Sequence, residues 1–408
     1  TPGIPTPVEW HERRDAGGRQ APKDPALNLD PLISQAFRLA RRRRCGYGSP
    51  ALEVSSMGLK VIQWSTGNVG RYALRAIIGH PELELVGLFV SSEAKEGKDA
   101  GELCGVDPVG IQATRDIDAL LALEADCVCY TADAGMRPGD AIEDMARILA
   151  SGKNVVSCSM VGLVHPTTLN DLFTAQLSAA CESGGTSFLT SGIDPGFAND
   201  TLPLVLSGLS EHWSEIRIQE IINYATYNQP ETIVDIMGIG KPLDHTPVLL
   251  MPGMLGFAWG GTLRLLAEGV GLELDEIREV HERRPATKPL QIGPYPIEVG
   301  TTAALRFEVQ GIVDGKPALV VEHVTRLDDD LAPEWPKSNG SYRVIIEGVP
   351  SMQVEYEFQD EHGDHAVGGV VLTATRIVNA IPAVCAAQSG LMSALDLPMI
   401  TGKGLYKP

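Results

Sequence analysis

The fold of this chain is decided by one stretch: Leu59-Lys-Val-Ile-Gln-Trp64, then Ser65-Thr-Gly-Asn-Val-Gly70, then Arg71-Tyr-Ala-Leu-Arg-Ala-Ile-Ile-Gly-His80. A short apolar run, a glycine turn and an amphipathic segment predict a strand, a tight turn and a helix. Gly67 lets the backbone approach a pyrophosphate, Gly70 lets the helix pack closely on the strand, and the free amides of the helix start hold phosphate. We therefore expect a dinucleotide to contact Ser65, Thr66, Gly67, Asn68, Val69 and Gly70, with Ser65 replacing the usual first glycine.

Strand and helix patterns keep alternating after this turn. Strands are expected at 83–90, 127–131, 154–159 and 187–190, with helices at 140–150 and 169–184. This alternation is typical of an α/β fold with a Rossmann-type, doubly wound parallel sheet, in which ligands bind beyond the carboxyl ends of the strands. Further residues expected in that crevice are Ser91, Ser92, Lys95, Thr131, Ala132 and Ser157.

Composition restricts the partners. The 408 residues include 33 Lys+Arg and 52 Asp+Glu, a formal net charge of −19, which disfavours nucleic acid and anionic lipid surfaces. No run approaches the roughly 18 consecutive apolar residues of a membrane span. The seven cysteines show no metal-ligand spacing and are expected to be reduced thiols in a cytoplasm. We expect a small-molecule substrate, no nucleic acid, no membrane and no metal.

Residues 1–56 differ from the rest of the chain. They are rich in proline and carry the basic run Arg41-Arg-Arg-Arg44. A basic arm or a targeting segment is one interpretation. We favour a disordered leader, or upstream sequence ahead of a natural start at Met57.

The choice between NAD and NADP depends on the tip of the second strand. An acidic residue there would bind the ribose hydroxyls of NAD and repel the extra phosphate of NADP. The chain has Ser91-Ser92-Glu93-Ala-Lys95 instead, and two hydroxyl donors with a cation suit a 2′-phosphate. We expect NADP, with NAD as the alternative if Glu93 turns inward.

At this point the sequence resembles the dihydrodipicolinate-reductase-like NAD(P) oxidoreductases, which include 2,4-diaminopentanoate dehydrogenase and the native amine dehydrogenases. The resemblance covers about 58–408. Besides the glycine turn, it rests on Lys98-Asp-Ala-Gly-Glu-Leu-Cys-Gly105, Gly152-Lys-Asn-Val-Val-Ser157, Gly192-Ile-Asp-Pro-Gly-Phe197 and Arg376-Ile-Val-Asn-Ala-Ile-Pro382.

The resemblance implies a second α+β domain inserted from about residue 200 and a last helix that returns to the first domain. The alternating patterns at 214–226 and 298–358 independently predict a largely antiparallel sheet, and helices are expected at 229–238, 251–270 and 370–390. We therefore expect a leader (1–56), a Rossmann domain (57–200), an α+β substrate or oligomerisation domain (201–368) and a C-terminal helix (369–408). A homodimer or higher homo-oligomer is expected.

The resemblance also implies a proton-handling glutamate after the strand at 154–159, where amine dehydrogenases are thought to activate ammonia or water. Met160 and Val161 stand there, and neither moves a proton. Reductive amination is therefore expected to be slow or absent. Efficient amination would mean that another carboxylate, such as Glu220, does the work, or that this loop aligns differently.

Two residues are the candidates for catalysis. His165 follows a strand tip and could supply a proton, although it could equally fix the turn before Pro166. Asp194 precedes Pro195 and Gly196 in the loop that, by resemblance, closes on the nicotinamide; it could also cap a helix.

Four further residues are weaker candidates. Asn379, inside the apolar late helix, is expected to bind the nicotinamide amide or a loop backbone. His323, beside Glu322, could reach the pocket or act as a cross-strand partner. His362 and His365 fit a solvated turn better than a metal site.

These features predict an NAD(P)H-dependent oxidoreductase. It would pass hydride between the nicotinamide and a small, fairly apolar carbonyl, imine or activated alkene, in a site that positions the two carbons and excludes water. The alternative is a dinucleotide-binding sensor or a substrate-binding protein of the same fold.

Overall fold

The structure is a computed structural model that describes residues 58–407, except 136, 169–170 and 228. The predictions for residues 1–56 and for a start at Met57 lie outside the described residues. Residues 55–408 group into one compact unit, which is described here.

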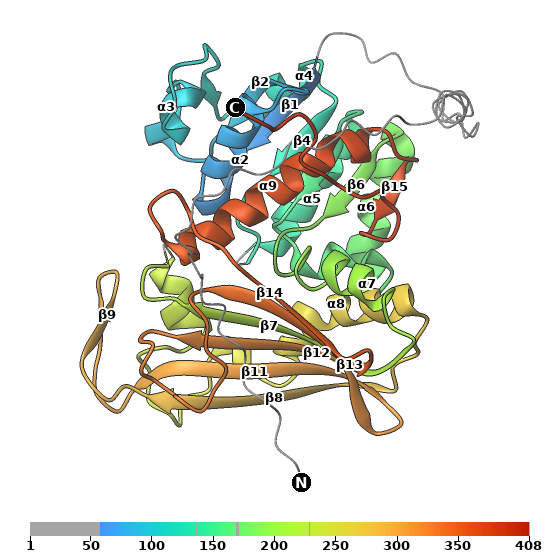
Figure 1. The fold of residues 1–408 in the computed structure, drawn as a ribbon. Coiled ribbons are helices and arrows are strands. Elements are labelled where there is room, and N and C mark those ends of the chain that lie inside the picture. The colour runs from blue at the N-terminus through green and yellow to red at the C-terminus, as the bar shows by residue number, and fades with distance from the viewer. Residues whose placement is uncertain (1–57, 136, 169–170, 228, 408) are drawn as a thin grey trace, which may run out of the picture. The chain divides into compact units, whose positions relative to one another are not determined.

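The first sheet has seven strands in the order β15-β6-β5-β4-β1-β2-β3 (Figure 1). Every strand pair in it is parallel, which confirms the predicted doubly wound sheet. Its strands are β1 (Leu59–Trp64), β2 (Leu83–Phe89), β3 (Ala113–Thr114), β4 (Cys127–Tyr130), β5 (Asn154–Ser157), β6 (Ser187–Thr190) and β15 (Gly390–Met392).

Helices cover both faces of this sheet because each has an apolar side that needs burial. One apolar core joins helices α2 and α9 to the sheet, and a second joins α5 and α6 to its other face. The helices of this part are α2 (Asn68–Gly79), α3 (Ala100–Cys104), α4 (Ile117–Ala122), α5 (Pro138–Ala150), α6 (Asp171–Gly184) and α9 (His365–Cys385).

The second sheet has six strands in the order β14-β13-β7-β12-β11-β8. Its pairs are antiparallel except β7–β12, which is parallel, so the sheet is mixed and largely antiparallel as predicted. The strands are β7 (His212–Asn223), β8 (Glu276–Pro285), β11 (Thr302–Val313), β12 (Lys316–Arg326), β13 (Ser341–Val349) and β14 (Met352–Glu357).

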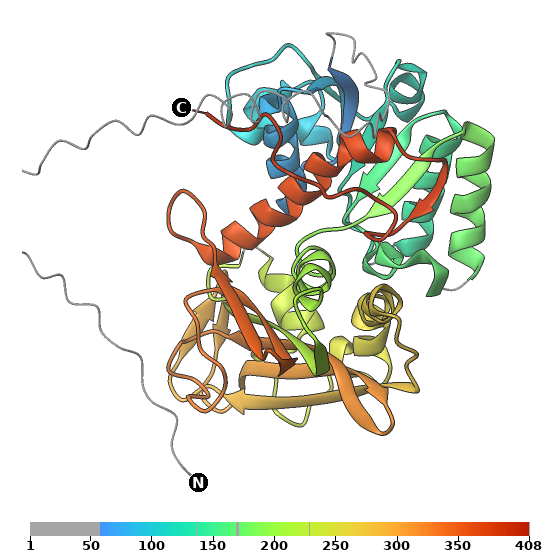
Figure 2. The same ribbon diagram turned by 45° about the vertical axis from the view of Figure 1, so that its right-hand side comes forward.

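Helix α8 (Met254–Val270) packs on one face of this second sheet, which we call the inner face (Figure 2). The remaining elements are α7 (Thr201–Ser207), the hairpin β9 (Leu290–Ile292) and β10 (Tyr295–Ile297), the 3-10 turns Glu93–Lys95, Val161–Val164, Pro166–Thr168 and Val248–Leu250, and a π-helical turn, Thr232–Ile236. The helix expected at 229–238 is thus only that π-helical turn.

The last helix, α9, returns to the first sheet as expected. It packs against β4, β5, β6 and α2. It begins earlier than predicted, at His365, because the Asp364 side chain accepts the Val367 N–H and caps it. Among the described helices only α9 is long and apolar enough to cross a membrane, and its packing on the sheet accounts for that apolarity.

Candidate functional site

The glycine turn between β1 and α2 has the geometry of a phosphate-binding loop. Ser65 has a φ of 81°, the left-handed conformation that explains why glycine usually stands there. A Cβ on Gly70 would lie 2.4 Å from the Ser65 carbonyl oxygen, so only glycine lets helix and strand approach this closely. Gly67 caps α2 without a side-chain hydrogen bond, and the first turn has no acidic residue. The helix start therefore offers free N–H groups to an anion.

A groove of about 650 Å³ opens beside this turn, at the carboxyl ends of the parallel strands. Seven of the residues expected to bind the cofactor line it: Ser65, Gly67, Asn68, Val69, Ser91, Thr131 and Ala132. Residues that the sequence did not single out also line it, among them Phe89, Arg137, Cys158 and Gln229. The Ser157 hydroxyl is buried and accepts the Ser159 N–H, so it shapes the loop after β5.

Lys95 lies over the glycine turn. Its Nζ donates to the carbonyl oxygen and to the Oγ1 of Thr66, both at 3.0 Å. Glu93, in contrast, is exposed. A positive charge is therefore held where the second strand meets the phosphate loop.

A second, smaller cavity of about 100 Å³ adjoins the groove. We call it the recess. Val69 lines both cavities, and Tyr227 lines the recess while lying within electrostatic reach of Cys158 in the groove. The recess is lined by Val69, Ile193, Asp194, Glu220, Ile222, Tyr224, Tyr227, Tyr342, Ala366, Gly369, Val370 and Thr373.

Asp194, His323 and Glu220 form a buried cluster at the recess. His323 Nε2 lies 3.1 Å from Asp194 Oδ2, and its Nδ1 lies 3.2 Å from Glu220 Oε1. Strand register explains the pairing, because His323 of β12 lies directly beside Glu220 of β7. Asp194 comes from the loop after β6, so the cluster joins the two sheets.

Neighbouring side chains fix each member of the cluster. Trp259 Nε1 donates to Asp194 Oδ1 at 2.7 Å, while Tyr224 and Tyr342 donate to the two oxygens of Glu220 at 2.7 and 2.6 Å. The His323 ring stacks on Phe307, with centroids 4.6 Å apart. The cluster is thus rigidly preorganised.

The imidazole between the two carboxylates is positively charged. Both its nitrogens face carboxylate oxygens, which only accept hydrogen bonds, so both need a proton. Burial alone would lower the pKa of His323, but Asp194 and Glu220 outweigh it and raise that pKa to about 10. Burial would likewise raise the pKa of Glu220, but His323 and the two tyrosine hydroxyls hold it below its usual value. Two carboxylates and one imidazolium leave one negative charge in excess.

The same three residues are the one group within the described ranges whose ligand atoms lie close enough to hold a metal ion. Each imidazole nitrogen already faces a different carboxylate, so an ion would have to displace the ring from between them. The arrangement fits a shared proton better than a metal.

The structure separates the two catalytic candidates. Asp194 lines the recess. It caps no helix, since α7 begins at Thr201 and its cap is Asp200. His165 is buried against α8, with Nε2 2.8 Å from Glu268 Oε2, and it lines neither cavity.

Of the other predicted residues, Gly196 shapes a loop of the site, and the rest do not line either cavity. Gly196 adopts a φ of 150°, and a Cβ there would lie 2.0 Å from the Gly192 carbonyl oxygen, so it shapes the loop that carries Asp194 and Pro195. Thr66, Ser92 and half-buried Asn379 line neither cavity. The His365 ring nitrogen Nε2 hydrogen-bonds the backbone of Asn223. Within the described ranges, His365 is not part of a group of side chains close enough to hold a metal ion.

Sequence reasoning missed the aromatic residues around the cluster. Tyr224, Tyr227, Tyr342 and Trp259 come from three separate segments, and no local pattern marks them as neighbours. Glu220 and His323 could have been paired if the register of β7 against β12 had been known, because they are opposite residues in that register.

Comparisons with known proteins agree with this architecture. Residues 197–403 match the model of the 2,4-diaminopentanoate dehydrogenase C-terminal domain, and 61–159 match that of the dihydrodipicolinate reductase N-terminus. An amine dehydrogenase of Streptomyces virginiae is 42% identical over 349 residues, covering 84% of this chain and 96% of that protein. The chain belongs to the amine dehydrogenase and 2,4-diaminopentanoate dehydrogenase family.

Two further proteins are similar to this chain at lower identity. The 2,4-diaminopentanoate dehydrogenase of Acetoanaerobium sticklandii is 23% identical over 285 residues, covering 69% of this chain and 76% of that one. The structure of an amine dehydrogenase from Mycobacterium smegmatis shares the fold, with a TM-score of 0.68, 18% identity and coverage of 85% and 97%.

Family membership confirms the predicted resemblance and makes this protein an NAD(P)-dependent oxidoreductase. The groove fits that cofactor class, because the turn offers free amides and the close approach that a pyrophosphate needs. Met160 and Val161, where the sequence analysis expected the glutamate, line neither cavity. The carboxylates that do line the recess are Asp194 and Glu220.

Proposed function

We propose that this protein is an NADP(H)-dependent amine dehydrogenase acting on a small, largely apolar primary amine and the matching ketone or aldehyde. One observation carries the proposal: a recess with one excess negative charge adjoins the cofactor groove at Val69. Such a charge favours an aminium group over a neutral carbonyl. The names of the relatives point the same way.

The protein's own residues would position the reacting groups and move one proton. When bound in the groove lined by Ser65, Gly67 and Thr131, the nicotinamide cofactor would supply the hydride acceptor for the amine-bearing carbon in the oxidative direction. Glu220 accepts the proton that the nitrogen loses as the C–N bond becomes a C=N bond. Water then adds to the carbon of the resulting iminium ion and ammonium leaves, which gives the carbonyl product. Apolar residues such as Ile193, Ile222 and Val370 limit water to that one step.

The sequence predicted that amination would be slow or absent, and that efficient amination would mean another carboxylate does the work or the loop aligns differently. We propose that another carboxylate does the work, with Glu220 as the replacement. It is 5% exposed, it lines the recess, and tyrosine hydroxyls and His323 hold its carboxylate in the ionised form that a base requires.

Lys95 supports the choice of NADP. Its ammonium is fixed at Thr66, beside the place where the second strand meets the phosphate loop. A 2′-phosphate at that place would gain a charge-assisted hydrogen bond, whereas the 2′-hydroxyl of NAD would gain less.

The test is turnover in both directions. We expect NADP⁺ reduction with primary amines of three to six carbons, and NADPH oxidation with the matching ketones only when ammonium is present. Equal NADPH oxidation without ammonium would identify a carbonyl or alkene reductase instead. Cofactor binding with no turnover of any amine, ketone or enone would favour a sensor.

The cellular location and the oligomeric state are also part of the proposal. The cysteines within the described residues are free thiols, in keeping with the proposed cytoplasmic location. A homodimer or higher homo-oligomer is also proposed, and light scattering coupled to size-exclusion chromatography tests it.

A further inference from the structure

We propose that the recess is a dedicated binding site for the substrate nitrogen, as ammonium or a primary aminium, and that His323 sets its charge. This inference rests on the proposed function and names the residues that would replace the family's glutamate. It commits to a monovalent, hydrogen-bond-donating cation as the ligand.

The size of the recess fits a nitrogen with a short carbon stem. Its volume is about 100 Å³, and one water takes about 30 Å³ of liquid volume. An ammonium ion or the head of an alkylamine therefore fits, while the rest of a substrate would extend past Val69 towards the groove. A larger polar group would not fit without movement of the tyrosines.

The charge of the surroundings fits one monovalent cation. Asp194 and Glu220 face His323 from opposite sides, which leaves a single negative charge. Asp200 lies within electrostatic reach of both Asp194 and Arg376; burial raises the pKa of Asp200 and lowers that of Arg376, and the opposite charge of each partly offsets the shift of the other. Because the cluster is buried, its charge is poorly screened by water and salt.

The hydrogen-bond inventory leaves acceptors for the nitrogen. A carboxylate offers about four acceptor positions. Asp194 accepts the Trp259 N–H at Oδ1, while its Oδ2 has no hydrogen-bond partner although His323 lies 3.1 Å away; Glu220 accepts from Tyr224 and Tyr342, so neither set is filled. Ammonium donates hydrogen bonds in several directions and can use these remaining acceptor positions.

Aromatic rings strengthen the selectivity for an organic cation. Tyr224 and Tyr227 stack with centroids 4.9 Å apart, and both line the recess with Tyr342. Rings of this kind attract an ammonium through their quadrupole and accept the adjoining alkyl carbons. The recess thus combines a fixed charge with an apolar wall.

His323 is a positioning residue because its positive charge acts through the two carboxylates. Without it, two buried carboxylates would face each other, and repulsion would make one of them take up a proton near neutral pH. With it, the cluster keeps one negative charge across the neutral range. The tyrosines that feel the charge of the cluster are Tyr224, Tyr227, Tyr342 and Tyr356, and the pKa of each is raised by burial and by Glu220, so they stay neutral.

The experiment measures binding without turnover. The NADP⁺-loaded protein is titrated calorimetrically with methylammonium and, separately, with sodium and potassium at equal ionic strength. Methylammonium has one carbon, fewer than the proposed substrates, and so probes the nitrogen site alone. We expect saturable methylammonium binding that ammonium displaces and the two metal ions do not. Glu220→Gln, which removes the excess charge, should weaken binding at least tenfold, while Tyr342→Phe should change it only a few-fold.

The role of His323 has its own readout. In the wild type, methylammonium affinity should be constant from pH 6 to pH 8, whereas in His323→Gln it should rise with pH as the carboxylate pair loses its shared proton. Thermal melting and NADPH binding show whether each variant is folded. If methylammonium affinity is independent of pH in both the wild type and His323→Gln, then His323 does not set the charge of the recess.

Failure of the inference and failure of the proposed function look different. Amine turnover without methylammonium binding, or undiminished binding in folded Glu220→Gln, overturns the nitrogen site and leaves the dehydrogenase intact. Binding without turnover of any amine supports the site and overturns the dehydrogenase.

Discussion

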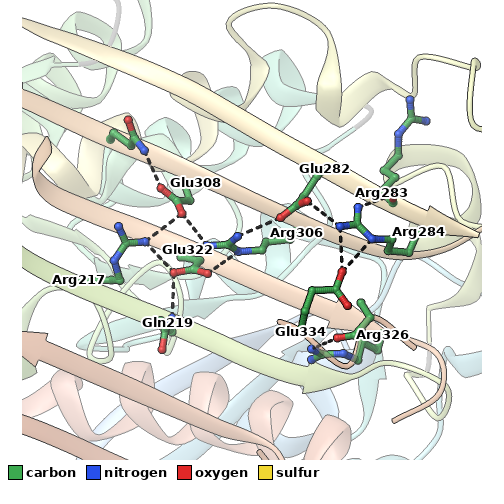
Figure 3. A network of polar contacts seen from close by, with 12 residues as sticks. Arg217, Gln219, Glu282, Arg283, Arg284, Arg306, Glu308, Glu322, Arg326 and Glu334 are labelled. Carbon is green, nitrogen blue, oxygen red and sulfur yellow. Dashed lines mark hydrogen bonds and ion pairs between the residues drawn. The ribbon is translucent and has the colours of Figure 1, made fainter. Parts of the chain in front are cut away.

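The two faces of the second sheet carry the same residue types and use them in opposite ways. On β7 and β12, Gln219 and Glu322 point to the outer face, while their neighbours Glu220 and His323 point to the inner face. On the outer face, Glu322 lies 2.8 Å from Arg217 and 2.6 Å from Arg306, and both arginines also contact Glu308 (Figure 3). Two carboxylates there meet two guanidinium groups.

The difference between the faces is that the inner charges are fully buried, whereas the outer ones are partly open to solvent. The pKa of Glu322 is held below its usual value because Gln219, Arg217 and Arg306 outweigh the effect of burial. The same network also takes in Glu215, Glu282, Glu334 and Arg284, most of which are partly open to solvent, so water screens whatever charge is left over. The inner cluster of Asp194, Glu220 and His323 is more deeply buried than the outer network, and its two carboxylates face one imidazolium. A buried imbalance of this kind marks a ligand site more clearly than the mere presence of charged residues.

The largest expected effect concerns the inner carboxylate. Glu220→Gln keeps the size of the side chain but removes the base, so turnover of amines should fall about 10²–10⁴-fold. NADPH affinity should stay unchanged, since Glu220 does not line the groove. The matched control is Glu355→Gln, on the outer face against Arg343, which should keep nearly full activity. Equal losses in steady-state assays of the two variants would erase the distinction between the faces.

Alkaline pH should act on the inner face alone. His323 has a folded-state pKa of about 10, above its unfolded value near 6.5, so its contribution is complete below about pH 6.5 and is lost as pH rises towards 10. Stability should fall by at most about 1.4 kcal/mol per pH unit across that window. Urea unfolding between pH 6 and pH 9.5 measures this slope. His323→Gln should lack it, and a slope that survives in the variant contradicts the assignment.

Loss of the outer carboxylate should cost stability rather than catalysis. Glu322→Gln leaves Arg217 and Arg306 with one carboxylate fewer. Breaking a buried pair costs about 3–5 kcal/mol, and partial exposure of the arginines should reduce this to about 2 kcal/mol. Chemical denaturation measures the loss, and kcat of the folded variant should match the wild type. A large fall in kcat with unchanged stability would mean that the two faces are coupled.

The smallest expected effect lies outside the sheet and tests cofactor choice. Lys95→Ala should weaken NADPH binding by about 1.5 kcal/mol, roughly tenfold, the lower end for a charged hydrogen bond because Lys95 is half-exposed. NADH binding should change less than twofold. Fluorescence titration with both cofactors gives the ratio. An equal loss for the two would point to Glu93 and to NAD.

The sequence was most informative where structure is local. The turn at 65–70 dictates its own geometry, since glycine alone permits the close contact at Gly70. Alternating strands and helices then leave few topologies other than a doubly wound sheet. The boundaries of α9 and the π-helical turn at Thr232–Ile236 were less predictable, because capping and tertiary packing decide them.

The recess could not be derived in this way. Asp194, Glu220 and His323 are far apart in sequence and meet because the loop after β6 reaches the inner face of the second sheet. Side chains alternate along a strand, so a shift of one residue in register would put Glu220 among the outer arginines. The sequence by itself therefore determined the nucleotide-binding fold, whose rules act between neighbours along the chain. Only the tertiary structure decided which carboxylates are left with an unbalanced charge, because strand register and burial are set by contacts between distant segments.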